Sequence, residues 1–519
     1  MKKFFSLLGF DPENKETSVK TEFTAGLVTF LSMAYILTVN PNQLFDKTNP
    51  EMVSYWASSF VATAFGAVFG TLLMAFLAKM PLAQASGMGL NSMIGSLIAG
   101  VAGYNAAFTP GQAFMLVFIS GLVFMALSVI TIRGKTIREL VFDGMPTSVR
   151  SAISVGIGLF IAYIGFQNAG IIVTDNFTQI GFVDLSNWGE QIIKTGNLGT
   201  NQDTGALVWS PITGTAAKTA VVALIGLFAI TILDKLNVKG AIIFGILGAT
   251  VIGIPLGVTD LSLLKGTDGV SWKFWENFGN FFCSDKSVFG SFLDVFNEGL
   301  IPDGVSVFSV MMILVTLCMI DMFDTMGTIV GCCGGNRILS DENNKPHNYG
   351  KIMLADSLAT CGGAMLGTST VTTVVESGAG VSAGGRTGLT AFSTACLFFA
   401  SLFALPLFAT IPSAAAASAL IYVGVLMMKN NIKSVDFSDA INATSAFLTI
   451  SVILLSYSVT NGIGIGLISY TLMSVCEYLV QLIISVIKKT EKPKWNVSAV
   501  TIIVAILFIV YFFVPADLF

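Results

Sequence analysis

The sequence predicts an all-α polytopic membrane protein with about fourteen transmembrane spans in two inverted halves of seven. Three observations support this prediction. The composition is too apolar for a soluble protein, the basic residues are distributed between loops as fourteen spans require, and short motifs of the first half recur in the second.

The composition excludes several classes of protein. Of the 519 residues, 54% are hydrophobic and 11% are charged, against roughly 25% charged residues in an average soluble domain. A soluble enzyme of this length would need far more charge to cover its surface. The net charge of −4 includes no basic tract of the kind that binds nucleic acid. Seven cysteines without C-x-x-C spacing indicate neither a disulfide framework nor a zinc site, so no metal or other cofactor is expected.

A spanning helix needs about 20 mostly apolar residues, and fourteen segments fit, several of them short or interrupted by glycine. They are residues 23–40, 55–79, 86–103, 113–132, 146–166, 216–234, 239–257, 304–329, 351–367, 378–385, 387–411, 412–428, 441–457 and 460–485. One further apolar run, 497–515, follows a basic stretch and fits either a spanning or an interfacial segment.

The lysines and arginines set the orientation, because cytoplasmic loops are enriched in them. With the N-terminus inside, 21 of the 27 basic residues fall in inside loops and ends. Two long polar, acid-rich loops, about 167–215 and 258–303, then fall outside. No cleaved signal peptide is expected, because the first residues hold two lysines but no long apolar run.

A weak internal repeat relates the two halves. The motif SGMG at 86–89 resembles SGAG at 377–380, and Pro146 and Pro412 open similar small-residue helices. Because each half has an odd number of spans, the second half is inverted relative to the first. Inverted repeats of this kind are an architecture of transporters.

Two segments at matching places in the halves break the helical pattern. They are MPLAQASGMGLNSMIG, residues 80–95, and GTSTVTTVVESGAGVSAGG, residues 367–385. Residues 368–375 are mostly β-branched, which favours a strand followed by a glycine turn and a half-helix. Paired breaks point to a binding site at the membrane midplane, where half-helix N-termini face a polar ligand. The alternative is a pair of glycine hinges that only pack closely against neighbouring helices.

Few carboxylates lie within the predicted spans. Asp321 and Asp324 share one face of a helix, and Glu376 lies in the second break. Ionised groups at this depth are costly and mark ligand or ion pathways, although a capping or helix-pairing role is the alternative, most of all for Asp324. The only histidine, His347, lies in a charged inside loop, so carboxylates are the candidates for carrying protons.

Four stretches carry a resemblance to a known family. They are TEFTAGLVTFLSMAYILTVNP (21–41), GMGLN (87–91), IDMFDTMGT (320–328) and GTSTVTTVVESGAGVSAGGRTGLTA (367–391). In these the chain resembles the nucleobase–cation symporter type 2 family, in its azaguanine-type purine permease branch. The resemblance implies a uracil-permease-like 7+7 inverted repeat, with short antiparallel strands in spans 3 and 10 that meet at the site.

The resemblance also implies domains. A core domain would comprise residues 1–145 (spans 1–4) and 304–411 (spans 8–11). A gate domain would comprise 146–257 (spans 5–7) and 412–519 (spans 12–14 with the C-terminal apolar segment), and 258–303 would be an extracytoplasmic loop.

By the same resemblance, Glu376 would hold the edge of the purine ring. Asp321 would be a second ligand or the proton carrier, Asp324 would support it, and Gly89 and Asn91 would line the site from span 3. Ser377 and Gly378 follow Glu376 in the motif and are counted with the substrate-binding residues. Ser92, Met93 and Val375 depart from the family's pattern, which leaves fine specificity open.

The function implied is secondary active import of guanine, hypoxanthine or adenine across the plasma membrane, by proton symport with alternating access. The expected partners are the purine, the coupling cation and the lipid bilayer, and a homodimer is kept open. One alternative is a transporter of uracil, xanthine or an inorganic anion on the same fold, although acids in the site disfavour an anion. An intramembrane aspartyl protease would need Gly-x-Gly-Asp, and here Cys-Met-Ile precedes Asp321, so an enzyme is not expected.

Overall fold

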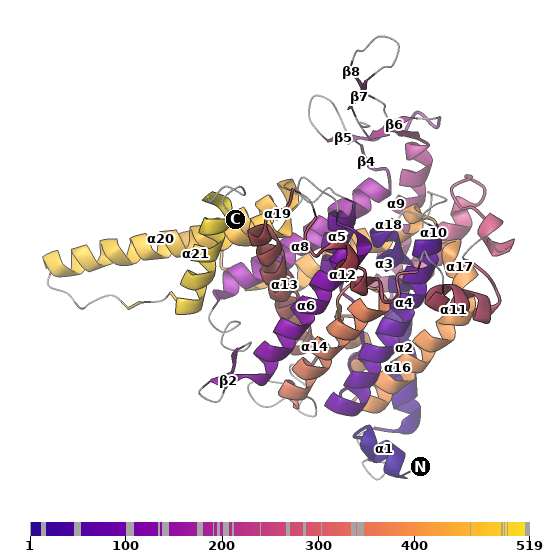
Figure 1. Cartoon of the computed structure of the whole chain (residues 1–519), viewed down its shortest axis with the longest axis horizontal. Helices are drawn as coiled ribbons and strands as arrows, with labels where there is room; N and C mark the ends of the chain where they lie inside the picture. Colours follow the sequence, from indigo (N-terminus) through magenta and orange to yellow (C-terminus); the bar gives the residue numbers. More distant parts are fainter. Residues whose placement is uncertain are drawn as a thin grey trace.

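Each of the fourteen segments predicted to span the membrane contains a helix in the computed structural model (Figure 1). The structure describes residues 2–11, 17–45, 53–99, 108–132, 135–137, 145–173, 180–189, 191–194, 198–200, 207–209, 212–238, 240–265, 270–283, 287–302, 304–333, 339, 347–456, 458–488, 491, 494–495 and 497–513.

The first half of the chain begins with a short helix and then forms seven spans, the third of them interrupted. Its elements are α1 (Lys2–Leu7), α2 (Val19–Met33), α3 (Ile36–Leu44), α4 (Val53–Leu73) continued by a π-helical turn (Met74–Ala78), β1 (Gln84–Ser86), α5 (Met88–Ile98), α6 (Pro110–Val129), α8 (Thr147–Asn168), α9 (Ala216–Lys235) and α10 (Ala241–Gly253).

The second half has the counterpart spans and one further helix. Its elements are α13 (Val307–Cys333), α14 (Tyr349–Leu366), β10 (Val371–Thr373), α15 (Ser377–Ser382), α16 (Gly388–Ser401), a 3-10 turn (Leu402–Ala404), α17 (Leu405–Ala409), α18 (Ser413–Asn431), a 3-10 turn (Ile432–Ser434), α19 (Ala440–Leu455), α20 (Val459–Lys488) and α21 (Ala499–Phe513).

The segments between spans hold the remaining elements. They are β2 (Thr131–Ile132), β3 (Lys135–Thr136), β4 (Ile172–Val173), β5 (Gly181–Phe182), β6 (Gln191–Lys194), β7 (Leu198–Thr200), β8 (Leu207–Trp209), β9 (Ile212–Gly214), a 3-10 turn (Ser262–Lys265), α11 (Phe274–Cys283), a 3-10 turn (Ser291–Leu293) and α12 (Val295–Glu298). Strands β4 to β9 pair as β4–β5, β6–β9 and β7–β8, beyond one end of the bundle (Figure 1).

Within the described residues, eight helical segments are long and apolar enough to cross a membrane, and five more are apolar but shorter. The sequence explains several ends. The Ser18 side chain caps α2, and Thr109 caps α6 through a reciprocal bond with Gln112. Gly367 ends α14 with φ +83°, a left-handed conformation that favours glycine. The interrupted third and tenth spans, with their short strands, confirm the predicted fold class.

One local feature was not predicted: at Ala34 and Tyr35, between α2 and α3, span 1 tightens into a turn with i→i+3 hydrogen bonds, while both residues keep helical backbone angles. The second strand is also shorter than the predicted extended segment 368–375, because only Val371–Thr373 pair with a partner strand. Side-chain hydroxyls of the preceding residues bond to neighbouring helices instead.

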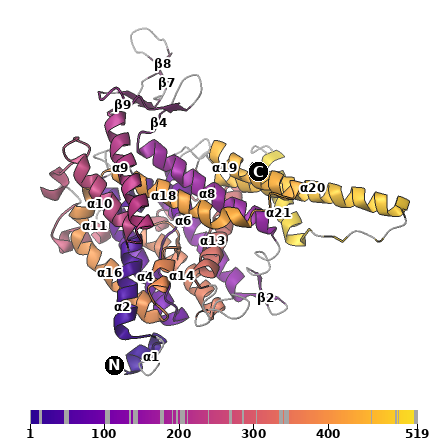
Figure 2. The same cartoon turned by 180° about the vertical axis from the view of Figure 1, so that it is seen from behind.

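Two groups of helices pack together. In one, α2 packs against α16, and α14 packs against α4 and α6; in the other, α18 packs against α8 and α9, and α20 packs against α19. Helix α5 contacts α8, which joins the groups at the third span. Helix α20 extends away from the bundle, and α21 packs against it (Figures 1 and 2).

Candidate substrate site at the strand crossing

The two interrupted segments meet where their strands cross. Strands β1 and β10 pair antiparallel, with Gln84 opposite Thr373, and the Gly87 N–H donates to the Thr370 carbonyl at 3.0 Å. Helix α5 follows β1 and α15 follows β10, so two helix N-termini approach the crossing. Since α15 has six residues, less than two turns, α5 supplies the longer of the two helices.

Glu376 lies in the turn after β10, directly before α15. The Tyr35 hydroxyl donates a hydrogen bond of 2.5 Å to Glu376 Oε1. Tyr35 is 1% exposed, whereas Glu376 is only half-buried. The tightened turn of span 1 therefore places a buried tyrosine against one carboxylate oxygen, while Glu376 keeps part of its surface accessible. Tyr35 was not predicted as a site residue, because no local feature of the sequence indicates that its hydroxyl reaches Glu376.

The two residues after Glu376 differ in their surroundings. The buried Ser377 hydroxyl accepts a hydrogen bond from the Ala83 N–H at 3.0 Å and lies 3.3 Å from the Ala83 carbonyl. Ser377 thus fastens α15 to the segment before β1. Gly378 is half-buried, and a Cβ there would lie 3.5 Å from Cys332 Sγ. Gly378 is the more accessible of the two residues.

The third-span residues lie on two sides of α5. Asn91 is fully buried, and its side-chain oxygen accepts a hydrogen bond from the Ser369 hydroxyl. Gly89 faces the other group of helices, because a Cβ there would lie 2.6 Å from Cγ2 of Ile157 on α8. Only glycine permits this close approach of α5 to α8 without a shift.

The two aspartates of α13 have different neighbours. Asp321 is 3% exposed, and the Thr360 hydroxyl lies 3.2 Å from its Oδ2. Asp324 is half-buried, and its Oδ2 lies 3.7 Å from the position of a Cβ on Gly87, at the start of α5. Asp324 is close enough to Glu376 to interact with it electrostatically. The structure thus brings Asp324 to the crossing with Glu376, and places Asp321 against α14.

Asp356 of α14 is a further carboxylate, and it lies at the crossing itself. It is fully buried. Its Oδ1 lies 3.2 Å from Gln84 Nε2, 3.1 Å from the Thr372 hydroxyl and 3.2 Å from the Thr373 N–H, and its Oδ2 accepts from the Thr325 hydroxyl at 2.9 Å. All these partners can donate, so the network favours an ionised carboxylate as acceptor. Asp356 joins β1, β10, α13 and α14.

Asn40 of α3 is a second missed residue. It is fully buried, and its side-chain nitrogen lies 2.7 Å from the Thr63 hydroxyl, 3.2 Å from that of Ser86 and 2.8 Å from that of Thr368. These bonds tie span 1 to both interrupted segments. The available signal was an amide within an apolar span, where an unsatisfied polar group is costly.

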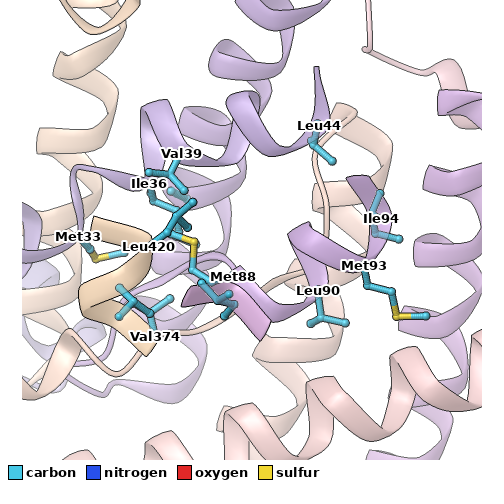
Figure 3. Close-up of a cluster of buried hydrophobic side chains, with 14 of the residues drawn as sticks. Met33, Ile36, Val39, Leu44, Met88, Leu90, Met93, Ile94, Val374 and Leu420 are labelled. Atoms are coloured by element: carbon cyan, nitrogen blue, oxygen red, sulfur yellow. The ribbon is translucent and has the colours of Figure 1, made fainter. Parts of the chain in front are cut away.

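Apolar side chains surround the crossing on the side of span 1. Figure 3 shows Met33 and Ile36 of span 1 near Met88 of α5, Val374 after β10, and Leu420 of α18. Leu420 belongs to the other group of helices, so both groups contribute to this wall. Among the described residues, no cluster of three or more His, Cys, Asp or Glu side chains has a geometry that could hold a metal ion.

Known proteins with similar sequences are permeases. The model of the Permease family (Xan_ur_permease) matches residues 20–193 and 198–465. The guanine/hypoxanthine permease PbuO of Bacillus subtilis is 33% identical over 508 residues, covering 97% of this chain and all of that protein. The adenine permease AdeQ of Escherichia coli is 30% identical over 461 residues, covering 89% of this chain and 88% of that protein.

Solved structures show the same fold at low sequence identity. The transmembrane domain of the cyanobacterial bicarbonate transporter BicA has a TM-score of 0.55 and 14% identity, covering 86% of this chain and 97% of that one. The structure of SLC26A9 has a TM-score of 0.54 and 10% identity, covering 92% of this chain and 69% of that one. The matched family model and the relatives of similar length show that this multi-pass membrane protein belongs to the permease family of nucleobase–cation symporters type 2.

Proposed function

We propose that this permease carries purine nucleobases, guanine, hypoxanthine or adenine, across the cell membrane by secondary active transport. The observation that carries the proposal is the half-buried Glu376 carboxylate at a crossing of two interrupted spans, held by Tyr35. The relatives named guanine/hypoxanthine and adenine permeases, at 30–33% identity, support the same class of substrate.

Recognition would use the chemistry of the purine edge. A purine presents ring N–H groups beside acceptors, and a carboxylate accepts one or two such bonds. Apolar side chains such as Met88 and Leu420 suit the faces of the ring. A site that holds the acids Glu376 and Asp324 disfavours an inorganic anion, because like charges repel. The bicarbonate transporter BicA therefore shares the fold of this chain, but we do not propose the same substrate class for this chain.

Alternating access would follow from movement of the core helices against the gate helices around this crossing. Gly89 of α5 lies close to Ile157 of α8, so this contact joins the two groups of helices, and such movement must change it. Protons are the proposed coupling ion, with the N-terminus in the cytoplasm.

The test is uptake into vesicles that contain the purified full chain. Radiolabelled adenine, guanine, hypoxanthine and uracil are offered with an inward pH gradient, with a sodium gradient, or with neither. Accumulation of purines under the pH gradient is expected. Uptake of uracil alone would contradict the substrate, and uptake that follows sodium and ignores pH would contradict the coupling ion.

Tyr35→Phe is expected to raise the KM for the transported purine by about tenfold, with the maximal rate within about twofold of the native rate. The ring stays in place, but the Glu376 carboxylate loses the hydrogen bond from the hydroxyl. Hydrogen bonds to a charged group contribute about 1.5–3 kcal/mol, and the freed carboxylate must be ordered when substrate binds. The measurement is initial uptake rate against purine concentration. Tyr55→Phe is the matched control, since Tyr55 stacks on Phe45 and no bond of its hydroxyl to a described residue is observed. An unchanged KM in Tyr35→Phe would contradict this role.

Asp321→Asn is expected to abolish accumulation driven by a pH gradient while retaining slow exchange of purine across the membrane. An amide resembles a protonated carboxyl group that never releases its proton, so binding persists and coupling is lost. The measurement compares uptake under a pH gradient with counterflow of labelled against unlabelled purine. Asp324→Asn is run in parallel, because Asp324 lies beside Gly87 at the start of α5. Full pH-driven accumulation by Asp321→Asn would exclude Asp321 as the carrier.

A further inference from the structure

Helix α11 lies in the segment that the sequence describes as a polar outside loop, and its rings pack on spanning helices. The Phe274 ring stacks on Phe403, after α16, with a centroid distance of 4.5 Å. The Phe278 ring lies 5.8 Å from the ring of Phe65 on α4, and Phe65 in turn lies 6.4 Å from Phe399 on α16. Helix α11 therefore covers the seam between α4 and α16.

The positions of Phe403 and Phe65 along their spans give the depth of two points of α11. Phe403, the partner of Phe274, is the sixteenth residue of the 22-residue span Gly388–Ala409, and Phe65, the partner of Phe278, is the thirteenth residue of the 26-residue span Val53–Ala78. At 1.5 Å per residue, Phe403 lies about 9 Å from the end of its span and Phe65 about 18 Å from the start of its own, so α11 reaches inward from Phe274 to Phe278. Both views draw α11 alongside α4 and α16 rather than beyond their ends (Figures 1 and 2). A loop in the surrounding water would touch only the ends of spans.

The outer surface of this segment is rich in large aromatic side chains. Trp275 is 70% exposed, Trp272 is 54% exposed and Phe296, in α12, is 79% exposed. Exposed aromatic groups are unfavourable in water and typical of the interface of a bilayer, where indole rings concentrate.

The charged residues of α11 and its N-terminal flank are arranged as in an interfacial helix. Lys273 and Glu276 form an exposed ion pair of 2.7 Å. Hydrogen bonds from Lys273 and Ser271 hold the pKa of Glu276 below its usual range, so the pair stays charged and needs contact with water or headgroups. An apolar aromatic face with a charged polar end is typical of helices bound at the membrane interface.

We propose that the N-terminal end of α11, with Trp272 and Trp275, lies at the headgroup boundary of the bilayer while Phe278 reaches the hydrocarbon region, and that lipid is what covers the exposed rings. The rings facing the protein close the seam between α4 and α16, and the rings facing outward continue the lipid-facing surface of Phe399 and Phe403, which are themselves exposed. The proposal is independent of which substrate the permease carries.

The test is quenching of tryptophan fluorescence in the full chain reconstituted into phosphatidylcholine vesicles. One variant retains Trp275 alone, with the other five tryptophans changed to phenylalanine. Its matched control retains Trp188 alone, which is 48% exposed and lies in the chain between β5 and β6, two of the strands that Figure 1 draws beyond the bundle. The quenchers are iodide in the water, and lipids brominated near the headgroup or near the chain end. To avoid dependence on multiple substitutions, the native chain is also compared with Trp275→Phe.

Trp275 is expected to be quenched strongly by lipid brominated near the headgroup and weakly by iodide, with the reverse order for Trp188. The Trp275→Phe chain is expected to lose part of the lipid-quenched signal of the native chain. Quenching of Trp275 by iodide as strong as that of Trp188 would overturn the proposal. Protection of Trp275 from both quenchers would overturn it as well, since protein rather than lipid would then cover the helix.

Discussion

Purine uptake is expected to fall to about one hundredth of the native rate or less in the Glu376→Gln protein. The carboxylate can accept two purine N–H groups, and hydrogen bonds to a charged group contribute about 1.5–3 kcal/mol each. Loss of both hydrogen bonds corresponds to a fall in purine affinity of at least about 100-fold. The amide keeps the shape of the side chain but presents one N–H₂ donor to a ring N–H, which replaces an attraction by a repulsion. The measurement is initial uptake of labelled guanine into vesicles containing equal amounts of protein.

The control for this experiment is Glu477→Gln, the same substitution on α20. Glu477 is exposed and bonds only to Gln481 among the contacts observed, so uptake should stay near the native rate. The melting temperature of Glu376→Gln protein in detergent should also stay near the native value, since Glu376 is only half-buried. Near-native uptake by Glu376→Gln would remove Glu376 from the binding site.

Asp356→Asn is expected to cause the largest loss of stability, about 3 kcal/mol, because it replaces an acceptor in a buried network by a donor that faces other donors. At least one bond, such as that from Thr325 or Gln84, must be lost, and the strand crossing is anchored by these bonds. A fall of the melting temperature by about 5 °C or more in detergent is the expected readout.

The comparison for Asp356→Asn is Asp184→Asn, an exposed aspartate that bonds to Ser186 in a turn, for which the melting temperature should change little. Thr325→Val supplies an intermediate case, since it removes one donor and leaves the carboxylate in place. A stable Asp356→Asn protein would show that the network is not what holds the crossing, and the pairing of β1 with β10 would then have to rest on the backbone alone.

Much of the fold followed from local properties of the sequence. Apolar length identified the spans, and glycines with β-branched residues identified the two interrupted segments, because membrane depth leaves few alternatives to a helix. The clearest differences lie in elements whose conformation depends on distant neighbours. Span 1 tightens into a turn at Ala34 and Tyr35 without a local glycine or proline, and 258–303 contains the aromatic helix α11 rather than only a polar loop.

Composition and local pattern were enough to predict a polytopic membrane protein, the positions of its interrupted spans, and the rare acids within them. Which groups meet at the site depends on the packing of the whole chain. Tyr35 bonds to Glu376 across 341 positions, and Gln84 bonds to Asp356 across 272. This packing also separates Asp324, beside Gly87, from Asp321, beside Thr360. The reason is physical: hydropathy and backbone propensity act over a few residues, whereas the partner of a buried polar group is set by the packing of helices far apart in the chain.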